Sequence, residues 1–229
     1  MIEAVLFDLD DTLFDQRTWL TGAWRAVAAV GAARGLDDEA LLVALADIAA
    51  EGSAAGRIID RALARLGVEA SDVTPYVEAF RDHQPPRLPL YPGVADALAR
   101  ARARLPIGLV TDGEVRIQRA KLAALGLTDA FDVVVFSDAL GRDRRKPHPA
   151  PFLTALGALG TEPARAVYVG DRPDKDVAGA IGAGLAPVRV RTGEYAAQPD
   201  LPAPRLSVAG VPEAVGAVLA WCESAMSVL

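Results

Sequence analysis

Two aspartates near the start of the chain have the types and spacing that covalent acid/base chemistry requires. The segment Phe7-Asp8-Leu9-Asp10-Asp11-Thr12-Leu13 follows a short apolar run. Side chains at positions i and i+2 of an extended chain point to the same side, so Asp8 and Asp10 can reach one substrate. One carboxylate can attack phosphorus while the other protonates the leaving oxygen and later deprotonates water. Taken alone, the pair could equally form a turn.

Polar residues also follow three later apolar runs. They are Thr111, Asp112 and Gly113, then Arg144, Arg145, Lys146 and Pro147, and then Gly170, Asp171, Asp174 and Asp176. Ligands of open parallel sheets bind outside the carboxyl ends of the strands, so these residues are expected at one edge.

Carboxylates gathered at one edge repel one another, and a divalent cation relieves that repulsion. Oxygen ligands without a nearby histidine or cysteine favour a hard ion, so Mg²⁺ is the expected cofactor. Lys146 and Thr111 would add a positive charge and a hydroxyl donor that neutralise and orient a phosphoryl group.

The same residues carry a family resemblance. Asp8 to Leu13, Val110 to Gly113, Arg145 to Pro147, and Gly170-Asp171 with Asp176 resemble the four ordered motifs of the haloacid dehalogenase-like hydrolases, across residues 4–184. The resemblance implies a role for each matching position. Asp8 would be nucleophile and metal ligand, Asp10 acid/base and backbone-carbonyl metal ligand, Thr111 and Lys146 phosphate stabilisers, Asp112 and Gly113 substrate-binding residues, and Asp171 and Asp176 metal ligands.

Two positions depart from the family pattern. Asp112 stands where relatives often have Asn, and its charge is unhelpful unless it points away from phosphate. His148 stands where relatives often have Asp, and that position is expected only to shape the loop.

Several neighbouring residues have simpler interpretations. Asp11 is expected to be a turn or cap residue, Asp174 to begin a helix, and Lys175 to be solvated. Arg144 and Arg145 favour a solvated loop, although one of them could contact Asp138.

The elements that position these residues alternate along the chain. Strands are expected at Ala4–Phe7, Ile107–Val110, Val133–Phe136, Val167–Val169 and Val188–Val190, where β-branched residues are frequent. Helices are expected at Val94–Arg104, Glu114–Leu125, Ala150–Leu159, Lys175–Ala183 and Pro212–Met226. This alternation predicts an α/β fold, a three-layer Rossmann-like doubly wound parallel sheet.

One interval interrupts the alternation. Helical patterns occur at Arg17–Arg34, Asp38–Ala50, Ala54–Leu66 and Ser71–His83, and a segment with four prolines, residues 84–93, follows them. We therefore expect an inserted all-helical cap domain at 15–88, with the catalytic core at 1–14 and 89–229. By resemblance, the insert belongs to the family's first cap class.

Composition limits the class of protein. The 229 residues carry a net charge of −6, which disfavours nucleic acid as a partner, and Cys222 is the single cysteine. No secretory signal or membrane span is apparent, so we expect a cytoplasmic protein. The 24 basic residues include only three lysines, Lys121, Lys146 and Lys175.

The sequence thus predicts a magnesium-dependent hydrolase of small phosphate monoesters, acting on a small phosphorylated metabolite through an aspartyl-phosphate. A sugar phosphomutase on the same core stays open, and a catalytically silent binding protein is a weaker alternative. A dehalogenase is disfavoured, because attack on carbon needs no acid to protonate the leaving group and Asp10 occupies the position of such an acid. The ester, the cap residues that contact it, and the choice between monomer and homodimer are not determined.

Overall fold

The computed structural model describes residues 1–52, 55–68 and 72–226. The chain forms two compact units. One combines Met1–Gln16 with the chain from Arg87 onward, and the other is Arg17–Pro86. No helix in the described part has the length and apolar character needed to cross a membrane.

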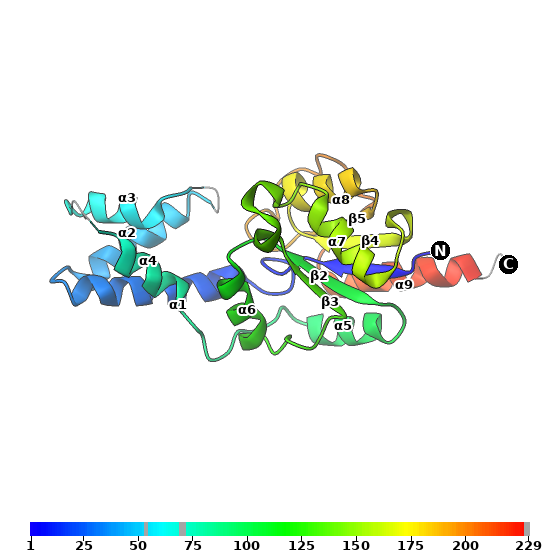
Figure 1. Cartoon of the computed structure of the whole chain (residues 1–229), viewed down its shortest axis with the longest axis horizontal. Coiled ribbons are helices and arrows are strands. Elements are labelled where there is room, and N and C mark those ends of the chain that lie inside the picture. The colour runs from blue at the N-terminus through cyan, green and yellow to red at the C-terminus, as the bar shows by residue number, and fades with distance from the viewer. Residues whose placement is uncertain (53–54, 69–71, 227–229) are drawn as a thin grey trace. The chain divides into compact units, whose positions relative to one another are not determined.

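The first unit is built on a parallel sheet with the strand order β3-β2-β1-β4-β5-β6 (Figure 1). The strands are β1 (Ala4–Phe7), β2 (Ile107–Thr111), β3 (Val133–Phe136), β4 (Ala166–Gly170), β5 (Ala186–Val190) and β6 (Leu206–Val208). Every residue of β1, β2 and β4 is buried, as expected for central strands covered on both faces. Their carboxyl ends therefore meet at one edge, where the polar residues of the sequence motifs follow.

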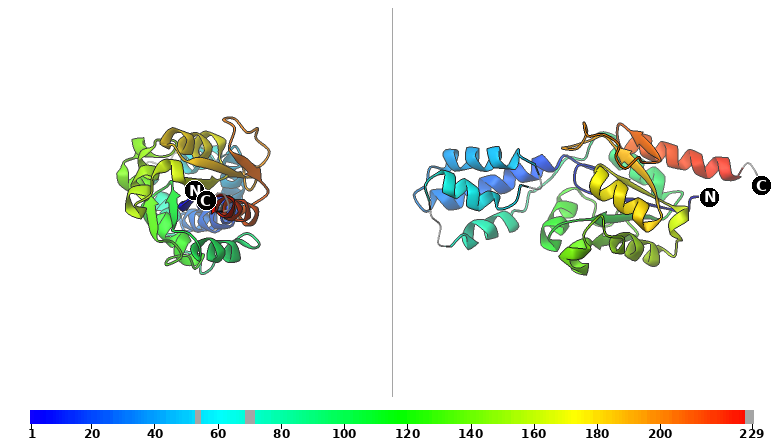
Figure 2. Two further views of the ribbon diagram at one scale, coloured as in Figure 1. Left: turned by 90° about the vertical axis from the view of Figure 1, so that its right-hand side faces the viewer. Right: turned by 90° about the horizontal axis from the view of Figure 1, so that it is seen from above.

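Helices cover both faces of this sheet (Figure 2). They are α5 (Val94–Arg102), α6 (Val115–Ala124), α7 (Ala150–Leu159), α8 (Ala178–Ala183) and α9 (Val211–Met226). Phe152 of α7 and Ala180 of α8 pack on Ala4 and Leu6 of β1 in one buried cluster. Helices α5 and α9 contact each other, and α9 also contacts β4, β5 and β6. The core is thus the predicted three-layer Rossmann-like α/β fold.

Helices are the regular elements of the second unit within its described residues. It contains α1 (Gln16–Ala32, which begins in the first unit), α2 (Asp38–Ala49), α3 (Ile58–Arg65) and α4 (Thr74–Arg81). Trp24 is buried there against Leu45, Leu63 and other apolar side chains. Such burial is typical of an aromatic residue on the apolar face of a helix.

Several boundaries differ from the sequence expectations. β6 was not predicted, because three residues with a central serine at a sheet edge are too short and too polar to give a strand pattern. The helix expected from Lys175 is preceded by a π-helical turn, Pro173–Val177, before α8 begins. Short 3₁₀ turns occupy Ser137–Leu140, Arg142–Arg144 and Pro163–Arg165. The helix expected at Ala54 begins at Ile58, and residues 53–54 and 69–71 lie outside the described part.

Candidate active site

Asp8 lies immediately after β1 and is held in place by the sheet itself. Its N–H donates to the carbonyl of Val169 in β4 at 2.9 Å, so the sheet fixes the backbone from which the carboxylate projects. The carboxylate accepts hydrogen bonds from Lys146 Nζ at 2.5 Å and Thr12 Oγ1 at 3.3 Å. Asp8 is buried, which leaves its carboxylate poorly solvated.

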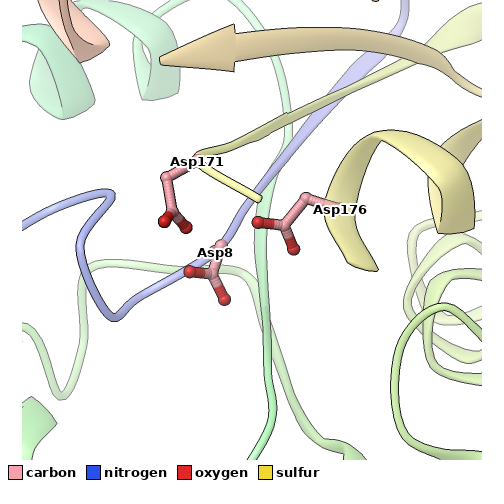
Figure 3. Close-up of side chains that lie close together, drawn as sticks. All are labelled: Asp8, Asp171 and Asp176. Atoms are coloured by element: carbon pink, nitrogen blue, oxygen red, sulfur yellow. The ribbon is translucent and has the colours of Figure 1, made fainter. Parts of the chain in front are cut away.

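Two further carboxylates lie beside Asp8. Asp171 follows β4 and Asp176 lies in the π-helical turn, and each offers an oxygen within 4.8 Å of the others (Figure 3). All three side chains are buried. Burial raises the pKa of Asp8 to about 7, against the lowering effect of Lys146. Burial and the charges of Asp176 and Asp8 raise the pKa of Asp171 well above its usual range.

This group of carboxylates fits a hard divalent ion. Three carboxylates and the single ammonium of Lys146 have a formal charge of −3 + 1 = −2, which a doubly charged cation balances. The donors are all oxygen atoms, the ligand type that Mg²⁺ prefers. Asp8, Asp171 and Asp176 are the residues that would hold it. Asp10 was also predicted as a metal residue, but its carboxylate lies outside this group, and its expected contribution was a backbone carbonyl.

Lys146 lies between the carboxylates. Its ammonium donates to Asp8 Oδ1 at 2.5 Å, Asp176 Oδ1 at 2.8 Å and the Tyr168 hydroxyl at 3.0 Å. Burial acts to lower the pKa of Lys146, but the charges of Asp176 and Asp8 outweigh it, and the pKa lies well above its usual value. The lysine therefore stays positively charged where an anionic group would bind. Tyr168, inside β4, was not singled out from the sequence.

Two residues of α6 hold Asp10 and Thr111. Gln118 Nε2 donates to Asp10 Oδ2 at 2.9 Å and to Thr111 Oγ1 at 2.6 Å. Lys121 Nζ donates to Asp10 Oδ1 at 2.6 Å. Sequence reasoning missed both residues. The available signal was a lysine and a glutamine three positions apart, which share one face of a helix in a chain that rarely uses lysine.

Asp112 points toward the loop that carries Lys146. Its Oδ1 accepts from Ser137 Oγ at 2.7 Å and from the Lys146 N–H at 3.1 Å, and its Oδ2 accepts from Lys175 Nζ at 3.1 Å. Burial acts to raise the pKa of Asp112, but the Lys146 charge, the Ser137 hydroxyl and Lys175 bring it below its usual value. The expectation that Lys175 is simply solvated was wrong, because its ammonium pairs with this carboxylate.

The loop after β3 is organised by a second carboxylate, that of Asp138. Arg145 donates to both of its oxygens, each at 2.5 Å, which confirms that one arginine of this loop contacts Asp138. The Gly113 N–H donates to Asp138 Oδ1 at 3.2 Å, so this predicted substrate-binding group already has an acceptor. His148 Nδ1 accepts from the Ala150 N–H at 3.1 Å, which agrees with a loop-shaping role.

Asp11 is a turn residue, as expected. It has a left-handed backbone with φ 55, and its carboxylate accepts the N–H groups of Gln16 at 3.0 Å and Glu194 at 3.2 Å. It thereby joins the turn after β1 to the segment that follows β5.

Arg189 supports Asp171 from inside β5, and no sequence pattern singled it out. Its guanidinium is fully buried and donates to the carbonyl of Asp171 at 3.1 Å. It also donates to the carbonyls of Gln198 at 2.9 Å and Tyr195 at 2.6 Å, and to Asp200 Oδ1 at 2.6 Å. A single arginine therefore ties the loop beyond β5 to the backbone of a candidate metal residue.

The chain is similar to known proteins in sequence and in fold. A family model described as haloacid dehalogenase-like hydrolase matches residues 2–184. A glyceraldehyde 3-phosphate phosphatase from Methanopyrus kandleri is 38% identical over 203 residues, which cover 85% of this chain and 86% of that protein. A phosphoglycolate phosphatase from Rhodospirillum rubrum is 34% identical, covering 87% and 83% respectively. The crystal structure of a 2-haloacid dehalogenase from Pseudomonas syringae pv. tomato is 27% identical and aligns with a TM-score of 0.65, covering 96% of this chain and 100% of that one.

Proposed function

The chain belongs to the haloacid dehalogenase-like hydrolases, and from that premise we propose that it is a magnesium-dependent phosphatase of small phosphate monoesters. The observation that carries the proposal is the buried contact between Asp8, Lys146 and Asp176, beside Asp171. A carboxylate next to a permanently charged ammonium at the end of a sheet is suited to attack a bound phosphoryl group.

We propose that Asp8 is the nucleophile. A carboxylate oxygen of Asp8 forms a bond to phosphorus while the bond from phosphorus to the ester oxygen breaks. The departing oxygen takes the electron pair and a proton from Asp10 and leaves as the alcohol. Asp10 then accepts a proton from water as the water oxygen attacks phosphorus, which releases inorganic phosphate and regenerates Asp8.

The other site residues stabilise the negative charge of the phosphoryl group. Lys146 supplies a fixed positive charge, and Thr111 supplies a hydroxyl already oriented by Gln118. Asp112 contributes backbone at the end of β2, whereas Gly113 would have to release its hydrogen bond to Asp138 before its N–H could meet a phosphate. Mg²⁺ held by Asp8, Asp171 and Asp176 would neutralise and orient the phosphate oxygens.

A dehalogenase is the alternative that the structural comparison raises. Loss of halide needs no proton donor, whereas loss of an alkoxide does. In this chain Asp10 is present and is held at both carboxylate oxygens by Gln118 and Lys121, which fixes the orientation of a candidate proton donor. The phosphatase names of the two sequence relatives favour the same conclusion.

We propose that residues 15–88 form a cap domain that selects the alcohol part of the ester. The two relatives act, by their names, on glyceraldehyde 3-phosphate and phosphoglycolate, both short phosphorylated metabolites. A substrate of two or three carbon atoms is therefore the first class to test. A sugar phosphomutase would use the same core residues and differs by rebinding its product.

The test is phosphate release from p-nitrophenyl phosphate and a panel of short phosphate esters, with Mg²⁺ and with a chelator. We expect Mg²⁺-dependent turnover that is lost in Asp8→Asn and kept in Asp129→Asn, a matched change at an exposed position. Absence of turnover with every ester, in protein saturated with metal, would refute the phosphatase. Release of halide from a 2-haloacid, or interconversion of sugar phosphates without phosphate release, would support the alternatives.

A further inference from the structure

The three lysines of this chain all contact aspartates around the candidate site. Lys146 bonds to Asp8 and Asp176, Lys175 to Asp112, and Lys121 to Asp10. The chain has 24 basic residues, so 24 − 3 = 21 of them are arginines. A residue type that is rare overall is thus concentrated at one place, and Lys121 is the lysine that lies outside the four motif segments.

Burial of the Lys121 side chain costs free energy unless its ammonium interacts with the carboxylate beside it. Its side chain is 6% exposed, and the Asp10 side chain that it contacts is 21% exposed. Removing an ammonium from water is unfavourable, and a well-packed apolar side chain of similar size is often as stable or more stable at such a position. Fold stability alone therefore gives a weak reason for a lysine here.

Gln118 lies one turn earlier on the same face of α6 and completes the arrangement. Its side chain is buried, and its amide nitrogen donates to both Asp10 Oδ2 and Thr111 Oγ1. Lys121 occupies Asp10 Oδ1, so each carboxylate oxygen of Asp10 has one fixed donor. Each oxygen keeps a second lone pair, which is where a transferable proton can bind.

We propose that Lys121 and Gln118 are positioning residues that fix the orientation of the Asp10 carboxylate for proton transfer to the leaving oxygen. The proposal rests on the proposed phosphatase activity. Lys121 and Gln118 both come from α6, so this helix sets the direction of the Asp10 carboxylate relative to Thr111. The end of β1 sets the position of the nucleophile Asp8. Neither residue is expected to contact the reacting phosphorus.

This role predicts a dependence on the leaving group. An alkyl phosphate such as glycerol phosphate needs protonation of its leaving oxygen, because an alkoxide is a strong base. The p-nitrophenolate ion is a much weaker base and leaves without a proton. Correct placement of a general acid contributes roughly 10²- to 10⁴-fold to rate, so its misplacement should show selectively with the alkyl ester.

The experiment compares kcat/KM of the wild type, Lys121→Met and Gln118→Met with glycerol phosphate and with p-nitrophenyl phosphate, at saturating Mg²⁺. For Lys121→Met we expect a loss of about 30-fold or more with the alkyl ester and less than about threefold with the aryl ester. For Gln118→Met we expect a loss common to both esters, because Gln118 also orients Thr111, and a further loss with the alkyl ester alone. Arg116→Met is the matched control, an exposed cation on the same helix, and should change neither value.

Equal losses with the two esters, or no loss with either, would overturn the positioning role, because a general effect of structure does not depend on the leaving group. Thermal unfolding of each variant shows whether it is folded. If Lys121→Met fails to fold, the result for Gln118→Met decides by the same criterion. If the wild type hydrolyses none of the short phosphate esters of the panel, the phosphatase proposal itself fails, which this design distinguishes from selective loss in a variant.

Discussion

The pair formed by Asp112 and Lys175 allows a quantitative prediction about the site. The two side chains are 14% and 30% exposed, and the carboxylate also accepts the N–H of Lys146 and the hydroxyl of Ser137. In Lys175→Met the carboxylate keeps these neighbours but loses a charged donor. A hydrogen bond to a charged group contributes about 1.5–3 kcal/mol, and partial exposure places this one near the lower end. We expect Lys175→Met to lower the free energy of unfolding by about 1.5 kcal/mol.

Replacing both partners should cost less than the sum of the single replacements. Asp112→Asn removes the charge that needs Lys175 but keeps an acceptor for Ser137 and the Lys146 N–H. The double variant Asp112→Asn/Lys175→Met should therefore recover about 1 kcal/mol relative to additivity. Lys175→Met should also lower kcat/KM, because Asp112 positions the backbone of Lys146, and the double variant should recover part of that loss.

Urea unfolding of the wild type, both single variants and the double variant measures this coupling free energy. The ion pair of Arg104 and Glu223 provides the control, since its side chains are 58% and 65% exposed. Its double-mutant cycle should give less than about 0.5 kcal/mol. Additive effects at Asp112 and Lys175, or a coupling no larger than in the control, would refute the reasoning.

Three other predictions concern single groups. Asp8→Asn should lower kcat by at least about a thousandfold, measured by phosphate release, without unfolding the protein, measured by thermal unfolding. Turnover equal to that of the wild type would exclude Asp8 as nucleophile. Burial raises the pKa of Asp8 from 3.8 to about 7. Between these two pH values the metal-free folded protein binds more protons than the unfolded chain, so its free energy of unfolding should fall as pH rises from 3.8 to about 7. Mg²⁺ should therefore raise Tm at pH 7.5, an effect that Asp171→Asn should largely remove; equal gains in Tm for both proteins would exclude Asp171 as a ligand. Burial lowers the pKa of His83 below 6.5, so the stability associated with neutral His83 should be lost as pH falls below that value. Below pH 6.5 the Tm of His83→Gln should therefore depend less on pH than the Tm of the wild type, and equal pH dependence in both proteins would contradict this role of His83.

The strand ends were the most predictable part of the molecule. Short apolar runs followed within two residues by Asp8, Thr111 and Asp171 locate the carboxyl edge of the sheet, because a parallel sheet places all such ends together. The roles of the residues at that edge remain predictions.

The supporting residues were less predictable for a physical reason. The target of Gln118 and Lys121 depends on how α6 is rotated about its axis, and the helix pattern alone does not set that rotation against the sheet. The pairing of Lys175 with Asp112 likewise joins residues far apart in sequence, through a π-helical turn that no local signal indicated. Arg189 lies in an apolar strand, where an arginine would ordinarily argue against burial.

Arg189 also bears on which length of chain can act as an independent unit. The family model ends at residue 184, before β5, yet Arg189 and the loop it binds hold the backbone of Asp171. A protein shortened to the matched residues would lose this guanidinium and leave the Asp171 carbonyl without its donor. The residues matched by the family model therefore do not form a complete structural unit. A chimaera that exchanges the catalytic core between relatives should include the chain through at least Asp200.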